Sequence, residues 1–194
     1  MASQKQLVAV VAETMGVPIE SVTVIDRYLA EAGLRTRALR GRGQTSMTYR
    51  DGAHLIIATA WEANPKDAVA LVTSFGQLPA SRVVEDAYVS ENALGATFAE
   101  ALANSLEFVP KHRKQFGAHE DSPDYMSLKV IMRQPHIEAD IILYKEGRKH
   151  TFQYRQPWDR RRGVFAVGDL SRSAEFSQIT LGFVGEVIAD GVDK

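Results

Sequence analysis

The chain of 194 residues contains no cysteine. That absence excludes disulfide bonds, thiolate zinc sites and a cysteine nucleophile, and it fits a reducing compartment. Long apolar runs are missing as well, and the N-terminus has no basic stretch followed by a hydrophobic segment. We therefore expect neither a signal peptide nor a membrane span, and the sequence predicts a cytoplasmic protein.

An excess of one charge is also absent, because 23 basic side chains stand against 24 acidic ones. Any affinity for DNA must therefore come from a local patch. Common catalytic motifs are missing too: the segment that begins at Gly41 follows a predicted helix and lacks the lysine of a phosphate-binding loop. His119, Glu120 and Asp121 lie in a polar loop without metal-ligand spacing. We expect no enzyme activity, cofactor or metal.

Helical periodicity dominates the first 80 residues. Pro18 is suited to the first turn of a helix, where a missing N–H costs nothing, and Gly33 to a left-handed C-terminal position. Ser46 or Thr48 is expected to cap a later helix that ends near Trp61. The predicted helices cover residues 4–15, 18–33, 46–61 and 64–76.

The second half of the chain changes period. After residues 80–90, which show no clear pattern, Ser90 is expected to cap a helix that Pro110 ends. Alternating apolar residues then predict a series of strands, with a hairpin turn at Glu146-Gly147 and a last helix capped by Thr180. The strand candidates are 125–133, 137–145, 150–155, 164–167 and 174–178. The sequence predicts an α+β fold in which helices flank an antiparallel β-meander.

Two charged groups in this half are expected to be ordinary surface features. Glu138 and Asp140 share one face of a predicted strand, where we expect solvent-exposed carboxylates. Arg155 and residues 160–162 surround Trp158, a pattern that can bind single strands. We favour a solvated turn with the tryptophan packed under the hairpin.

Residues 8–27 predict a helix-turn-helix. The small Ala12 lies where the first helix approaches the second, and Gly16 falls at the turn. Such a unit presents its second helix to the DNA major groove. Ser21, Thr23 and Arg27 are the candidates on that helix for contacts to phosphates or base edges. The apolar positions that fix the pair are Val11, Met15, Val17, Val22 and Ile25.

A basic arm, residues 35–50, follows the helix pair. It contains no acidic residue, and Gly41 and Gly43 interrupt its cations. This composition suits a backbone that follows phosphates or inserts an arginine into the minor groove, although a solvated loop is the alternative. Because Glu20 and Asp26 weaken the second helix as a base reader, we expect the arm to supply most of the affinity. Its candidate DNA-binding residues are Arg35, Arg37, Arg40, Arg42 and Arg50.

Residues 8–27 resemble the helix-turn-helix of small bacterial and phage DNA-binding proteins, and the predicted helices that follow extend the resemblance to residue 80. The overall plan also resembles phage terminase small subunits, with a helix-turn-helix, a helical oligomerisation region and a β-rich C-terminal segment. The resemblance implies DNA binding and dimerisation or higher assembly, without catalysis.

We therefore predict a DNA-binding domain over residues 1–80 and an α+β domain over residues 90–194 for oligomerisation or partner binding. The favoured function is a bacterial or phage transcriptional regulator that binds double-stranded DNA as a homo-oligomer. Two alternatives stay open. One is a phage DNA-packaging or assembly protein that binds DNA non-specifically, and the other is a protein-interaction module in which the helix pair is structural.

Overall fold

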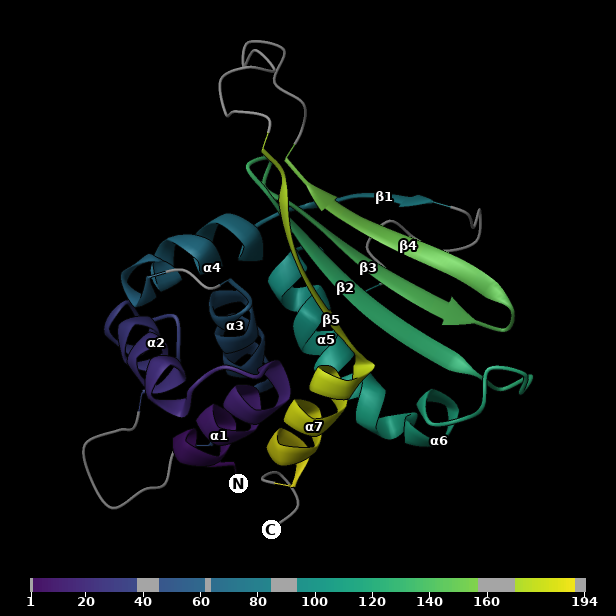
Figure 1. Ribbon diagram of the computed structural model, residues 1–194, viewed down its shortest axis with the longest axis horizontal. Coiled ribbons are helices and arrows are strands. Elements are labelled where there is room, and N and C mark those ends of the chain that lie inside the picture. Colours follow the sequence, from purple (N-terminus) through teal and green to yellow (C-terminus); the bar gives the residue numbers. More distant parts are fainter. Residues whose placement is uncertain (1, 38–45, 62–63, 85–93, 157–169, 191–194) are drawn as a thin grey trace.

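In the computed structural model, helices gather to one side of a five-stranded antiparallel sheet (Figure 1). The structure describes residues 2–37, 46–61, 64–84, 94–156 and 170–190. The predicted α+β class is confirmed.

The N-terminal helices form where the periodicity predicts them. Ser3 and Thr48 begin two of them with capping boxes, in which the cap side chain and the third helical residue satisfy each other's backbone N–H groups. Thr48, rather than Ser46, is therefore the cap of the third helix. The elements are α1 (Gln4–Met15), α2 (Ile19–Glu31), α3 (Tyr49–Thr59), the 3-10 turn η1 (Pro65–Asp67) and α4 (Ala68–Gly76).

The sheet has the strand order β1-β4-β3-β2-β5. Its centre is the predicted meander, and Glu146 (φ 54°) and Gly147 (φ 72°) form the tight turn between β3 and β4. β1 and β5 occupy the edges and pair with strands distant in sequence. The strands are β1 (Ala80–Val84), β2 (Met126–Gln134), β3 (Glu138–Lys145), β4 (Arg148–Arg155) and β5 (Arg172–Ser177).

The C-terminal helices differ from the expected bounds. α5 (Phe98–Lys111) begins at a capping box made by Thr97, while Ser90 and the strand candidate 164–167 lie outside the described residues. The expected polar loop 111–124 contains a short helix, α6 (Arg113–Phe116). α7 (Gln178–Ala189) follows β5 directly and is capped by Ser177, so the predicted cap Thr180 is wrong.

The segments that the sequence divides at residue 80 share one hydrophobic core. α1 packs on α7, and α3 packs on both α5 and α7. On the sheet side, Phe98 of α5 lies against the ring of Tyr154 in β4, with 5.7 Å between the ring centroids. The core therefore runs without interruption from the first helix through the last helix to the sheet.

The closest helix contact in this core joins α7 to α5. A Cβ atom placed on Gly185 would lie 2.0 Å from the backbone oxygen of Leu106 and 2.7 Å from the Cγ of Pro110. Pro110 lies inside α5 instead of ending it. Because proline has no N–H, the Leu106 carbonyl four residues earlier lacks its usual helical donor. The hydrogen that Gly185 carries in place of a side chain faces that carbonyl, an arrangement suited to a weak Cα–H···O contact.

We expect Gly185→Ala to destabilise the fold by about 3 kcal/mol or more, because the added methyl group would force α7 away from the α5 backbone. Gly182→Ala is the matched control, since its Cβ would meet only the Cγ1 of Val109, at 3.5 Å. This control gains up to about 1 kcal/mol from the better helix propensity of alanine. Urea denaturation of both variants checks the pair, and equal stabilities would contradict the proposed close contact.

Candidate nucleic-acid interface

α1 and α2 form the two-helix unit that the sequence predicts. Gly16 adopts a left-handed conformation (φ 66°) at the end of α1, and its N–H and that of Val17 donate to carbonyls of the last turn. Ala12 is buried, as are the apolar anchors Val22 and Ile25, and α1 packs on α2. These hydrogen bonds close the turn after α1. The C-terminal cap of α1 therefore sets the direction in which α2 begins.

One side of α2 is exposed, and α2 lies at the periphery of the molecule (Figure 1). Of the predicted contact residues, Thr23 and Arg27 lie on this exposed side, whereas Ser21 is half-buried. The Thr23 hydroxyl donates to the Ile19 carbonyl at 2.7 Å. The Arg27 guanidinium lies over the Tyr28 ring and 3.8 Å from the Glu31 carboxylate.

Asp26 does not face the solvent with the other polar residues of α2. Its side chain is fully buried, its Oδ1 lies 2.7 Å from the Nε of Arg35, and its Oδ2 accepts a 2.7 Å hydrogen bond from Gln4. Burial raises the pKa of Asp26, while the Arg35 charge and the Gln4 amide act in the opposite direction. The expected repulsion between Asp26 and phosphate is therefore replaced by an internal ion pair.

The arginines of the basic arm have different environments. Arg35 is held inside the fold, with its side chain only 13% exposed. Arg37 donates to the carbonyls of Ala30 (2.5 Å) and Glu31 (2.7 Å) and so caps the C-terminus of α2, where a cation also complements the helix dipole. Arg50 is exposed in the first turn of α3, and Arg40 and Arg42 lie outside the described residues.

Asp51 joins this segment to α3, a role that sequence reasoning missed. Its Oδ1 accepts from the backbone N–H of Thr36 at 2.7 Å, and its Oδ2 accepts from both the backbone and the hydroxyl of Thr48 at 2.8 Å. The T-x-x-D spacing of the capping box is the sequence signal that identifies half of this arrangement. Asp51 therefore places Arg50 beside the segment that carries Arg35 and Arg37.

His54, one turn further along α3, adds a second link. Its Nδ1 lies 2.6 Å from the Leu34 carbonyl oxygen, which can only accept, so the ring donates from Nδ1. Burial lowers the pKa of His54, the Leu34 hydrogen bond opposes this effect, and the Arg50 charge adds to it. The histidine is thus a neutral structural donor.

These contacts bring together three arginines whose side chains remain exposed. Arg37 contacts the last turn of α2, Arg27 lies one turn earlier, and Arg50 begins α3 next to the carboxylate that binds Thr36. Arg27 and Arg37 thus lie at the C-terminal end of α2, and Arg50 lies beside Asp51, which binds the residue before Arg37. We call these three arginines the arginine junction. Long flexible cations of this kind can reach phosphate oxygens.

Glu138, Asp140 and Arg155, which also stand out in the sequence, have charged partners within the sheet. Asp140 is buried, not exposed as expected, and lies 2.6 Å from Arg133 and 3.5 Å from Arg155, which also approaches Glu138. Trp158 and residues 160–162 lie outside the described residues. Within the described ranges, no group of three or more histidine or acidic side chains could hold a metal ion.

Comparison with protein-family models, curated proteins and solved structures gives no match to this chain. In the part of the chain that the structure describes, no helix is both long and apolar enough to cross a membrane.

We expect Asp26→Ala to destabilise the protein by about 3 kcal/mol, because it leaves the buried Arg35 guanidinium without a counter-ion. The double variant Asp26→Leu with Arg35→Met removes both charges and should recover most of that loss. Arg27→Ala, which breaks only an exposed pair, is the control and should change stability by less than about 1 kcal/mol. Chemical denaturation measures all three, and a wild-type stability for Asp26→Ala would disprove the structural role of the pair.

His54 should make folding sensitive to acid. Because its pKa is lowered from 6.5 in the folded state, the unfolded chain binds the proton more readily, so stability is lost as the pH falls below about 6.5. The slope from this group is at most about 1.4 kcal/mol per pH unit. His54→Asn supplies an amide donor near the Nδ1 position but cannot titrate. Denaturation at pH 7 and pH 5 should show a smaller loss for the variant, and an equal loss would contradict the assignment.

Proposed function

We propose that this protein binds double-stranded DNA through the exposed side of α2 and the arginine junction. The observation that supports this most directly is that exposed Arg27 and Arg37 lie at the C-terminal end of a helix whose outer side faces solvent, with exposed Arg50 linked to the same segment through Asp51 and Thr36. A helix of this kind can enter the major groove while flanking cations contact the phosphates on either side.

The charges on α2 favour binding to the DNA backbone over base recognition. Glu20 and Glu31 are exposed near its two ends, and Glu31 already pairs with Arg27. Thr23 offers a small hydroxyl between them. With few free donors for base edges, most of the affinity comes from phosphate contacts, which depend strongly on salt.

Two biological roles fit such binding. A transcriptional regulator requires a measurable preference for one duplex sequence, whereas a packaging or assembly protein requires only backbone binding by an oligomer. We favour the regulator, with Thr23 as its base-edge candidate and Arg27 as a phosphate contact.

A protein-interaction module is the second candidate, and a specific observation favours it. Arg35 is used inside the fold and Arg37 caps α2, so these arginines have structural roles that need no nucleic acid. In that case the two-helix unit serves only to support α3 and α7, and the exposed side of α2 contacts a protein.

The DNA proposal is tested with the double variant Arg27→Ala, Arg50→Ala. Both side chains are exposed and neither supports the buried Asp26 pair, so the fold should be retained. Each lost phosphate contact should make the slope of log K against log salt shallower by about 0.9, giving a change of about 2. Fluorescence anisotropy with a labelled duplex, titrated at several salt concentrations, measures this slope.

The matched control is Lys145→Ala with Lys149→Ala, which removes the same charge from the exposed β3–β4 hairpin. It should leave affinity and slope unchanged. If both double variants weaken binding equally, the binding reflects overall charge and not the arginine junction. If the wild-type protein does not bind duplex at low salt, the interaction module is the better hypothesis.

A further inference from the structure

α7 has an apolar outer face as well as an apolar inner face. Its inner side buries Leu181, Val184 and Ile188 in the core. On the outer side, Ile179 is 61% exposed and Phe183, one turn later, is 50% exposed. A helix that is apolar on both sides is usually covered on both, and an exposed apolar patch of this kind commonly marks an interaction site.

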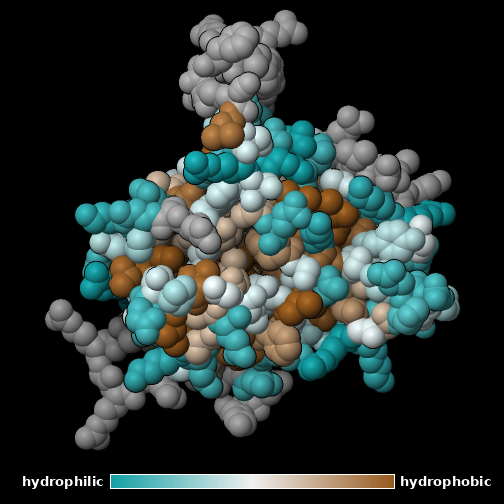
Figure 2. Space-filling model, in the orientation of Figure 1, coloured by the Kyte–Doolittle hydropathy of each residue, from teal (hydrophilic) through white to brown (hydrophobic). Residues whose placement is uncertain are grey.

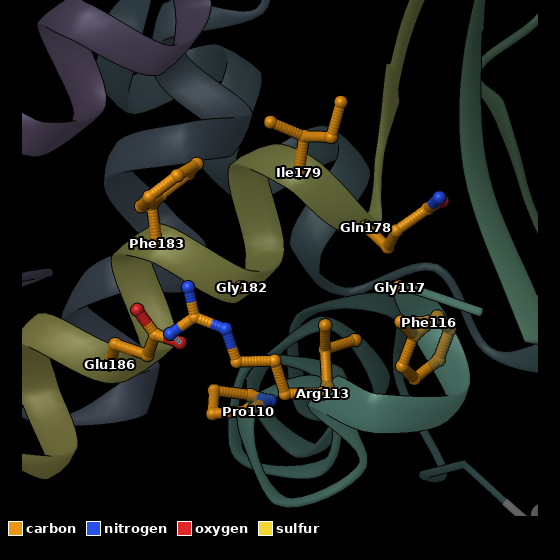
Figure 3. Close-up of a pocket in the computed structure, with 10 residues that line it drawn as sticks. Pro110, Arg113, Phe116, Gly117, Gln178, Ile179, Gly182, Phe183 and Glu186 are labelled. Carbon is orange, nitrogen blue, oxygen red and sulfur yellow. Dashed lines mark hydrogen bonds and ion pairs between the residues drawn. The ribbon is translucent and has the colours of Figure 1, made fainter.

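An open cavity adjoins these side chains, between the end of α5, α6 and α7 (Figure 3). Its volume is about 150 Å³. An apolar cavity of about this size can accommodate one benzene ring. Gly182 forms part of the cavity wall, and a Cβ atom at that position would lie 3.5 Å from the Cγ1 of Val109 in the same wall. The lining includes Val109, Pro110, Phe116, Gly182 and Phe183.

The patch formed by Ile179, Phe183 and the adjoining cavity therefore carries both a projecting phenyl ring and a cavity that fits one. In Figure 2, apolar residues likewise interrupt the hydrophilic surface over the helical part of the molecule. A two-fold axis passing between Phe183 and Gly182 would let the ring of each copy enter the cavity of the other. Such reciprocity is the requirement of an isologous dimer, in which one patch pairs with itself.

The charges at the rim satisfy the same requirement. The Nη1 of Arg113 lies 2.5 Å from the Oε1 of Glu186 (Figure 3), so the patch carries one positive and one negative side chain side by side. Two copies of this neutral rim do not repel each other, and the ion pairs can exchange partners across the axis. A partner of another kind would have to carry either a cavity for Phe183 or a ring for the cavity beside Gly182. A second copy of this chain carries both.

We propose that a second copy of this chain covers the outer face of α7, with Phe183 of each copy inserted into the cavity beside Gly182 of the other. This dimer uses none of the residues of the arginine junction, so it can be tested without DNA.

Sedimentation equilibrium of the full chain, without DNA, tests the proposal. The wild-type protein should dimerise, and Phe183→Asp should raise the dimer dissociation constant at least about 30-fold, as expected for a central aromatic anchor. Leu170→Asp is the matched control, because Leu170 is 75% exposed and precedes β5, at the opposite end of that strand from α7. It should leave dimerisation unchanged. A monomeric wild-type chain, or a Phe183→Asp variant with the wild-type dimer dissociation constant, overturns the proposal.

Gly182→Leu distinguishes insertion of the Phe183 ring from non-specific association of the apolar surface. The leucine adds apolar surface to α7 but fills the cavity. Insertion therefore predicts a monomer, whereas non-specific association predicts equal or stronger dimerisation. Sedimentation equilibrium measures the dimer dissociation constant of this variant, and equal or stronger association contradicts insertion.

Discussion

Helix α7 reaches the centre of the molecule only because Gly185 lets its backbone meet the Leu106 carbonyl of α5. The contact also explains how Pro110 is accommodated inside a helix, since the carbonyl that proline leaves without a donor is covered by a neighbouring backbone. From this position α7 supports both α1 and α3. The N-terminal helices therefore depend on a residue near the other end of the chain, and the core does not separate into two parts.

The buried Asp26 has a similar organising effect on the charged surface. By taking Arg35 into the fold, it removes one cation from the arm that the sequence presents as uniformly solvated. Arg37 keeps an exposed side chain while capping α2, so it is both structural and accessible. Among the described arginines of this segment, Arg35 and Arg37 are both held at the end of α2. For the proposed DNA binding, fixed cations define an orientation better than a free arm, because less conformational freedom is lost on binding.

Local signals predicted much of this architecture. The bounds of α1 follow from Ser3 and Gly16, and the β3–β4 turn follows from Glu146-Gly147, because each feature depends on residues within one turn. Features that depend on distant partners were missed. β1 exists because it pairs with β4, about 70 residues away, and its own sequence has no clear alternation. The burial of Asp26 requires Gln4 of α1 and Arg35, which follows the end of α2, to meet at one carboxylate. Periodicity also gives no sign that α1 and α7 share a core.

The proposed α7 dimer bears directly on the strength of the proposed DNA binding. One copy offers three exposed arginines in the described part of the junction, a number that supports only weak, salt-sensitive binding. α7 packs on α1, and α1 packs on α2, so a two-fold axis at α7 carries two complete helix pairs on one rigid support. If both reach the same duplex, the second contact becomes intramolecular and the affinity rises without any new type of interaction. If the distance between the two helix pairs does not match one helical turn of DNA, about 34–36 Å, the two copies instead bridge separate segments of DNA. The spacing set by the α7 contact therefore distinguishes a regulator of a palindromic site from a protein that assembles DNA.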